Sequence, residues 1–265
     1  MNRQLIDIGV NLMHRSFERD RDEVVGRSVE AGVSPLVLTG TSERNSDAAA
    51  RYAAKFPGQL FTTAGVHPHD TRNCTSRTRD TLRRLAKMSQ VVAIGECGLD
   101  YNRDFSPRDV QRTWFEEQIQ LACELEMPLF LHEREAHPDF VRILKPYLGT
   151  GKSKAVVHCF TGTLQELDVY LQLGLYIGIT GWICDERRGK HLRELVKRIP
   201  LERLMLETDA PFLTPRDLPV KPQDGRNEPV FLPHVAATVA HCLGKTVEEV
   251  AEATTRTARE FFGLR

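Results

Sequence analysis

Residue types that bind metal ions stand at the ends of several short apolar runs in this sequence. The run "VVAIGE" ends in Glu96, "PLFLHE" contains His132, and "KAVVHCF" contains His158. Two further runs lead to His67 and Asp209. Carboxylates and imidazoles together form a mixed oxygen and nitrogen ligand set, which suits a divalent cation that acts as a Lewis acid or activates water.

Glu96 is the central residue of this set because its two carboxylate oxygens can bridge two cations and neutralise both. Histidine ligands favour Zn, Mn, Fe or Ni, whereas carboxylates that share a site with phosphate oxygens also suit Mg. We predict four metal ligands: Glu96, His132, His158 and Asp209.

Strand geometry predicts which neighbours share the site, because successive side chains of a strand point to opposite faces. Cys97, Cys159 and Glu133 are each next to a predicted ligand and should point away from it. Arg134 has the same parity as His132 and should face the site. Glu207 has the parity of Asp209, and we expect this deeper carboxylate to contact a metal ligand.

The elements that must position these residues alternate along the whole chain. Apolar β-rich runs are separated by amphipathic stretches such as 108–126 and 137–148, and two helices follow Leu232. The runs lack clean alternation, which is typical of parallel strands covered on both faces. The residues that end these runs are Asp7, Gly40, His67, Glu96, His132, His158, Gly181 and Asp209, and all but the two glycines are of metal-ligand types.

Eight such units favour a TIM (β/α)8 barrel that forms one domain over 1–265. Polar residues at the strand ends of such a barrel meet on one face. A doubly wound open sheet is the alternative, but the first turn, "DIGVNLMHRSF", lacks a glycine-rich phosphate-binding pattern.

The composition limits the class of protein. The chain has 265 residues, a hydrophobic fraction of 41% and a formal net charge of zero, which argues against a high-affinity duplex binder. Its six cysteines include no C-x-x-C pair, and no apolar run approaches membrane length. We expect a soluble, cytoplasmic protein with reduced thiols.

Several motifs resemble the TatD family of metal-dependent deoxyribonucleases. They are "GVHPH", "AIGECGLD", "LHER", "VVHCFTG", "ITGWICDERRG", "ETDAPFL" and "RNEP", and they cover nearly the whole chain in order. The resemblance implies an amidohydrolase-type barrel and Mg-dependent hydrolysis of DNA. It implies that Glu96 bridges two metals, that His132 and His158 ligate one of them, and that Asp209 is a ligand and the general base.

The first strand departs from the family pattern. Many members carry D-x-H-x-H, whereas this chain has Gly9 and Asn11 in place of the two histidines, a variant that resembles bacterial TatD proper. We therefore expect one firm site and one weaker, oxygen-dominated site, with Mg most favoured and Mn or Zn as alternatives.

The predicted reaction is phosphodiester hydrolysis by an exonuclease on single-stranded DNA, and also on RNA, with a role in DNA repair or degradation. His67, His69 and Arg134 would offset charge on the phosphate, and Arg187 and Arg188 would contact the strand. Trp182 is the preferred stacking partner for unpaired bases. Further candidates for stacking are Tyr101, Phe105 and Phe160.

Two other functions fit the same residues. One is hydrolysis of an ester or amide in a small molecule or an aminoacyl-tRNA, since barrel metal sites host many reactions. The other is a non-catalytic binding barrel, with Gly9 and Asn11 as signs of loss. We expect a monomer, and we expect Arg226 and Glu228 of "RNEP" to shape the rim or support it.

Overall fold

The computed structural model describes residues 4–148 and 154–264. Eight parallel strands form one sheet in sequence order, from β1 to β8. A parallel bridge between Val10 and Ala210 brings the first strand beside the end of the last. The strands are β1 (Leu5–Val10), β2 (Val33–Leu38), β3 (Leu60–Ala64), β4 (Val91–Asp100), β5 (Leu129–Arg134), β6 (Ala155–Val157), β7 (Tyr176–Ile179) and β8 (Leu204–Leu206). The predicted barrel is thereby confirmed.

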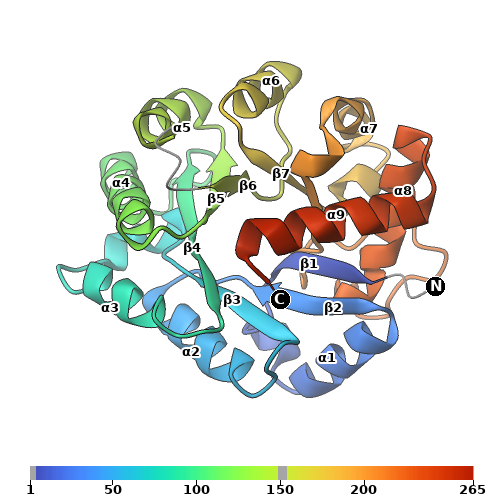
Figure 1. The fold of residues 1–265 in the computed structure, drawn as a ribbon, viewed down its shortest axis with the longest axis horizontal. Helices are drawn as coiled ribbons and strands as arrows, with labels where there is room; N and C mark the ends of the chain where they lie inside the picture. The colour runs from blue at the N-terminus through green and yellow to red at the C-terminus, as the bar shows by residue number, and fades with distance from the viewer. Residues whose placement is uncertain (1–3, 149–153, 265) are drawn as a thin grey trace.

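Helices surround the strands, as Figure 1 shows. The helices are α1 (Arg21–Glu30), α2 (Glu43–Ala53), α3 (Thr78–Leu85), α4 (Arg108–Leu125), α5 (His137–Leu144), α6 (Leu164–Gln172), α7 (Lys190–Leu195), α8 (Leu232–Leu243) and α9 (Val247–Phe262). Short 3-10 helices include η1 (Arg15–Phe17), η2 (Pro68–Asn73), η3 (Lys145–Tyr147), η4 (Gly181–Cys184), η5 (Val196–Arg198), η6 (Leu201–Arg203) and η7 (Pro229–Phe231). Among the described residues, no helix is long and apolar enough to cross a membrane.

Two apolar layers hold the barrel together. The outer layer lies between strands and helices and includes Cys97, so this cysteine faces outward as predicted. The inner layer fills the barrel with strand residues such as Ile8 and Phe130, and α9 adds Phe261 and Phe262. A filled interior leaves no passage through the barrel, so a site is confined to one of its ends.

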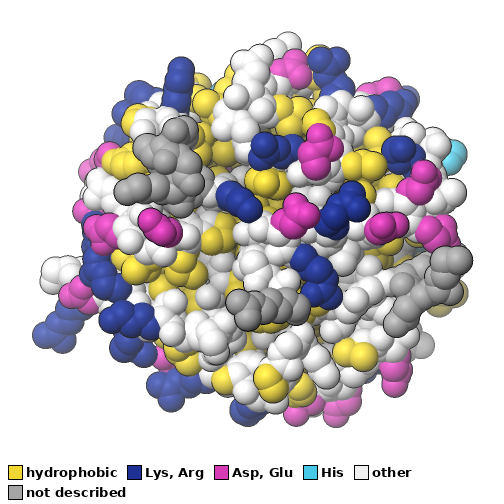
Figure 2. Space-filling model, in the orientation of Figure 1, with side chains coloured by type: hydrophobic (Ala, Val, Ile, Leu, Met, Phe, Trp, Pro, Cys, Tyr) yellow, Lys and Arg dark blue, Asp and Glu magenta, His cyan; other side chains and the backbone are white. Residues whose placement is uncertain are grey.

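Helix α9 covers the end at which the strands begin. The Thr255 hydroxyl donates to the carbonyl of Gln4, just before β1, and the Thr257 hydroxyl donates to Leu201, in η6 before β8. Figure 1 looks onto this end, with α9 crossing the strands. In the same view, Figure 2 shows cationic and acidic side chains interspersed over the surface. The opposite end carries the polar strand ends.

Strand β4 reaches further than the sequence predicts. It continues past Glu96 to Asp100 and stays paired with β5, with Gly98 opposite His132 and Asp100 opposite Arg134. Gly98 has a φ of 147°, a region that favours glycine, and a Cβ there would collide with the His132 carbonyl oxygen. This glycine therefore lets β4 carry a second carboxylate toward the strand ends.

Candidate metal centre

A pocket of about 830 Å³ opens at the end of the barrel where the strands finish. All four predicted metal ligands line it, together with His67, His69, Arg134 and Trp182. Eight of the nine predicted site residues are thus brought to one pocket by segments far apart in the sequence. Arg187 is the exception: the lining arginine of that loop is Arg188.

Glu96 lies at the centre of a group of imidazoles. Its Oε1 atom is 2.7 Å from Nε2 of His158, 3.0 Å from Nδ1 of His132 and 3.3 Å from Nε2 of His67. Burial by itself raises the pKa of Glu96, but the facing imidazoles outweigh it and hold that pKa well below its usual range. The side chain is therefore an anion at neutral pH, surrounded by nitrogen ligands.

Candidate ligand atoms of His67, Glu96 and His132 all lie within 4.8 Å of one another. His67 thus enters the group as a candidate ligand, which is one of the two roles, metal or phosphate contact, that the sequence suggested. Burial lowers the pKa of His67 to about 4, so its imidazole is neutral at pH 7 and keeps a lone pair for a cation.

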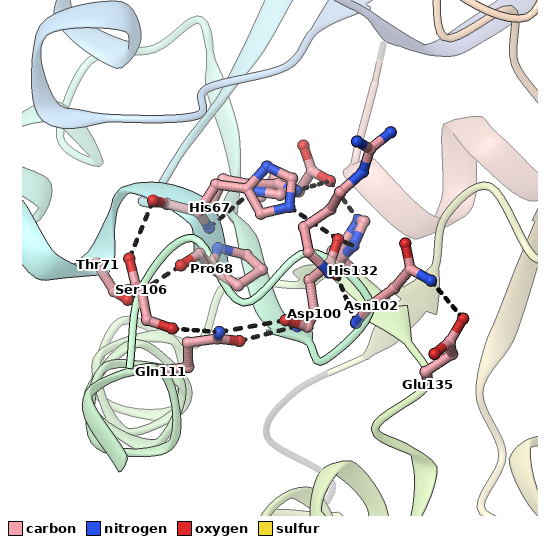
Figure 3. A network of polar contacts seen from close by, with 12 residues as sticks. His67, Pro68, Thr71, Asp100, Asn102, Ser106, Gln111, His132 and Glu135 are labelled. Atoms are coloured by element: carbon pink, nitrogen blue, oxygen red, sulfur yellow. Dashed lines mark hydrogen bonds and ion pairs between the residues drawn. The ribbon is translucent and has the colours of Figure 1, made fainter. Parts of the chain in front are cut away.

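Asp100 is a functional candidate that sequence reasoning missed. Its Oδ2 atom is 2.8 Å from Nε2 of His69 and 3.2 Å from Nε2 of His132 (Figure 3). Burial raises the pKa of Asp100, but the hydrogen bonds with His132 and His69 outweigh it and lower that pKa. The available signal was the second carboxylate in "GECGLD", four residues after Glu96.

The loop after β4 fixes Asp100 and His69 in place. The backbone N–H of Asp100 donates to Gln111 of α4, and the amide of Gln111 donates to Ser106 (Figure 3). The Ser106 hydroxyl in turn donates to the carbonyl of His69 at 2.9 Å. His132 is held between Glu96 and Asp100, and although burial lowers its pKa, these two carboxylates raise it overall.

Glu207 supports His158 from deeper in the barrel. Its Oε2 is 3.2 Å from Nδ1 of His158, and the backbone N–H of Cys159 donates to its other oxygen. This confirms the predicted contact with a metal ligand. Gly9 and Gly178 flank the carboxylate so closely that a Cβ at either position would collide with it. Gly9 therefore provides the space that Glu207 occupies.

Asp209 lies at the pocket wall in a left-handed backbone conformation, with φ at 55°. Its Oδ1 accepts a hydrogen bond of 2.8 Å from the Asn11 side chain, and its backbone N–H donates to Gly9. Burial raises the pKa of Asp209 to about 7, and the nearby charges of Glu96 and Glu207 contribute. Asn11 thus takes part in the site although it is not a histidine.

Asp7 is not among the lining residues, although its run suggested a place at the rim. It is fully buried within β1, where its carboxylate accepts hydrogen bonds from Gly9 and from both the backbone and the hydroxyl of Thr208. Burial raises the pKa of Asp7 to about 7. Asp7 therefore anchors the segment that carries Asp209.

Of two parity predictions, the one for Cys159 is wrong and the one for Glu133 holds. Cys159 lines the pocket instead of facing outward, because β6 ends at Val157 and Cys159 has a φ of 48°. Glu133 also borders the pocket, but its carboxylate accepts hydrogen bonds from Tyr170 of α6 and from the backbone of Ala136, which directs it away from His132. The alternation of faces holds only while the strand is regular.

The rim that faces the solvent differs from the predicted one. The Arg188 guanidinium lies 5.8 Å from the ring of Trp182, and both line the pocket. Arg187 lies outside the lining, because Asp185 accepts hydrogen bonds from the backbone of both arginines and fixes the turn between them. Phe212 also lines the pocket, is 48% exposed and packs edge-on against His14. Sequence reasoning missed it in the loop after β8.

Other predicted contacts lie elsewhere. Phe160 is buried at 3% exposure and cannot stack on a base, and Tyr101 donates its hydroxyl to Asp139 outside the pocket. Phe105 packs against His69 without lining the pocket. Arg226 and Glu228 belong to an ion-pair network with Asp20 and Arg27 and do not border the pocket either.

Comparison with known proteins identifies the family. Residues 6–263 match the family described as TatD related DNase. Proteins named 3'-5' ssDNA/RNA exonuclease TatD from Pantoea sp. (strain At-9b) and Erwinia tasmaniensis are 52% and 53% identical over 260 residues. These matches cover 98% of this chain and 100% of each relative.

Solved structures agree with this result. The TatD homologue YJJV of Escherichia coli K12 and a TatD family hydrolase of Entamoeba histolytica are 27% and 28% identical to this chain. Each superposes with a TM-score of 0.90, and all of both chains is covered. The predicted family and the predicted class of hydrolytic nuclease are confirmed, while the assignment to the "DIGVN" subgroup stays a prediction. The chain belongs to the TatD related DNase family.

Proposed function

We propose that this protein is a divalent-metal-dependent 3'-5' exonuclease that removes nucleotides from the ends of single-stranded DNA and RNA. The observation that carries the proposal is the Glu96 carboxylate, which three imidazoles approach through a single oxygen inside the pocket. The names of the Pantoea and Erwinia relatives support the substrate and the polarity. A role in DNA degradation or repair follows from this activity.

The residues of the pocket fit a cation. Glu96 and Glu207 are buried, Asp209 is half-buried beside them, and without a cation the pKa of Asp209 rises to about 7. Burying several carboxylates near one another is unfavourable unless positive charge accompanies them. His67, His132 and His158 would hold a firm site with Glu96, and Mn or Zn suits these imidazoles. Asp209, with Glu96, would hold a weaker, oxygen-rich site suited to Mg.

When bound, the divalent cation supplies positive charge for the scissile phosphate and lowers the pKa of water. The protein's own groups then position the reaction. Asp209 would accept a proton from water, because its carboxylate lines the pocket close to Glu96 and can act as a general base. Asn11 orients this carboxylate through the 2.8 Å hydrogen bond to Oδ1.

Side chains at the rim would guide the strand end. Arg134 and Arg188 are exposed at the pocket wall and offer positive charge to phosphates. Trp182 and Phe212 present aromatic faces for unpaired bases, which bind by stacking with little regard to sequence. His69 faces Asp100 and adds a donor near the centre. The two aromatic rings and Arg188 lie on the side of β7 and β8, so we place the strand there.

We further propose that the enzyme works as a monomer in the cytoplasm. All six cysteines are present as thiols and form no disulfide, which suits a reducing compartment.

The experiment uses single-stranded DNA and RNA with a label at the 5' end, and metal-stripped protein to which Mg, Mn or Zn is returned. A 3'-5' exonuclease converts these strands into progressively shorter labelled products, and a blocked 3' end stops it. Asp209→Asn should lower kcat by about 10²- to 10⁴-fold, as expected for loss of a general base. Asp224→Asn in the loop after β8 is the matched control.

Two results would contradict the proposal. Equal cleavage by Asp209→Asn and the parent would remove Asp209 from the reaction. No product with any metal, from protein shown by circular dichroism to be folded, would exclude the nuclease function of this pocket.

A further inference from the structure

A second group of metal-ligand side chains lies outside the pocket. Cys184 ends η4, Asp217 belongs to the loop between β8 and α8, and His234 lies in the first turn of α8. Candidate ligand atoms of these three residues all lie within 4.8 Å of one another. None of the three lines the pocket of Glu96. We propose that Cys184, Asp217 and His234 form a separate binding site for zinc or a similar thiophilic divalent cation.

The three side chains already converge. The Nε2 atom of His234 is 2.6 Å from Oδ1 of Asp217. Cys184 is fully buried, and a hydrogen bond joins its Sγ to the Thr238 hydroxyl at 3.3 Å, so the sulfur faces α8. Ligands about 2.0–2.3 Å from a tetrahedral zinc ion lie about 3.3–3.8 Å apart, so small side-chain rotations would close the site.

The chemistry of the three ligands selects the metal. A thiolate, an imidazole and a carboxylate together suit zinc, whereas Mg and Ca prefer oxygen ligands alone. Binding would release the proton of the Cys184 thiol, because the thiolate is the ligand. Water would complete the tetrahedron on the side where Asp217 and His234 are partly exposed.

The surrounding charges permit this occupancy. Arg193 forms an ion pair with Asp217, with Nη2 3.9 Å from Oδ2. Its Nε donates to the carbonyl of Ile183, so the guanidinium is held on the far oxygen of the carboxylate. The Oδ1 atom that faces His234 is therefore left for a metal.

Another candidate group among the described residues is less suitable. It consists of Glu133, His137 and Glu166. Glu166 closes the capping box of α6 with Thr163, and the two oxygens of Glu133 accept hydrogen bonds from Ala136 and Tyr170. Metal binding there would break contacts that hold α6 and the end of β5.

Occupancy of the Cys184 site would affect the pocket through the chain. It would join η4, which carries Trp182, to the loop that follows Asp209 and carries Phe212. A cation linking these segments to α8 would restrict the motion of both aromatic rings. The site is therefore a means of setting the width of the rim without a ligand in the pocket.

The test uses cobalt as a spectroscopic probe of the metal-stripped, full-length protein. A thiolate ligand gives cobalt a near-ultraviolet charge-transfer absorption that nitrogen and oxygen ligands do not give. We expect this absorption in the parent protein and its loss when zinc is added in excess over all the proposed metal sites and displaces the cobalt. We expect it to disappear in Cys184→Ser and to require at least about tenfold more cobalt in His234→Gln.

Control variants separate this site from the other thiols. Cys159→Ser is needed because Cys159 borders the pocket, and Cys242→Ser changes another cysteine of the α8 region. Both should keep the absorption. If Cys184→Ser fails to fold, Asp217→Asn and His234→Gln, which alter partly exposed residues, carry the test. No charge-transfer absorption in the parent, or an absorption that survives in Cys184→Ser, would overturn the proposal.

Discussion

The two sides of the pocket are built differently. On the side of β3 to β5, hydrogen bonds link the side chains of His69, Asp100, His132 and Glu96 in a continuous row. On the side of β7 and β8, Phe212 is 48% exposed and Arg188 lies over Trp182 at the solvent. The first side holds charges at fixed distances, as chemistry requires. The second can adjust to a flexible strand whose bases vary.

Removing the central charge should have the largest effect. Glu96→Gln takes away the anion that three imidazoles face, and it should weaken binding of the divalent cation at this point. Such a cation contributes several kcal/mol to stabilising the transition state of phosphodiester hydrolysis. We expect kcat/KM on single-stranded DNA to fall by about 10³-fold. Bound metal, measured by elemental analysis, should fall as well. Glu186→Gln, an exposed carboxylate of the β7–α7 loop, should change neither quantity.

A smaller loss is expected for the residue that supports the imidazoles. Asp100→Asn weakens the contacts that orient His69 and His132, so metal affinity or activity should fall by about 10- to 100-fold. Steady-state rates at increasing metal concentration would show which of the two falls. Asp139→Asn, which affects the partner of Tyr101 outside the pocket, is the matched control. Equal losses in both variants would mean that the effect of Asp100→Asn does not come from its contacts with His69 and His132.

Substitutions on the side of β7 and β8 should weaken binding of the strand and leave the rate of the chemical step nearly unchanged. Phe212→Ala removes an exposed ring, and stacking of one base on such a ring is worth about 1–3 kcal/mol. We expect KM for single strands to rise by about 5- to 100-fold with kcat nearly unchanged. Phe105→Ala, another exposed ring outside the lining, should have little effect. A fall in kcat with an unchanged KM would mean that Phe212 contributes to the chemical step and not to binding of the strand.

The pH dependence of stability should separate two buried aspartates in metal-free protein. Burial raises the pKa of Asp7 to about 7 from 3.8, so its stabilising contribution is complete below pH 4 and is lost as the pH rises toward 7. The pKa of Asp100 is lowered, so its contribution is present above pH 4 and is lost as the pH falls. Urea unfolding between pH 4 and 8 should therefore show a smaller loss on the alkaline side in Asp7→Asn. An unchanged slope would show that Asp7 is ionised in the folded protein.

Much of this arrangement could be predicted because it follows from strand order. The apolar runs determine eight strands, and parallel strands of a barrel bring Glu96, His132 and His158 together whatever the loops do. Asp100 was missed because a strand was expected to end at its first carboxylate, whereas Gly98 allows β4 to continue. The positions of Arg188 and Phe212 at the pocket depend on the conformations of single loops, and a periodic sequence pattern does not predict loop conformation.

The close packing of Gly9 against Glu207 limits how this metal centre could change over evolutionary time. A histidine at position 9 would need the space that the Glu207 carboxylate fills, so the substitution is obstructed while Glu207 stays in place. Replacing Glu207 first would remove the partner of His158. A larger residue at position 9 therefore requires the Glu207 carboxylate to move, and with it the hydrogen-bonding partner of His158.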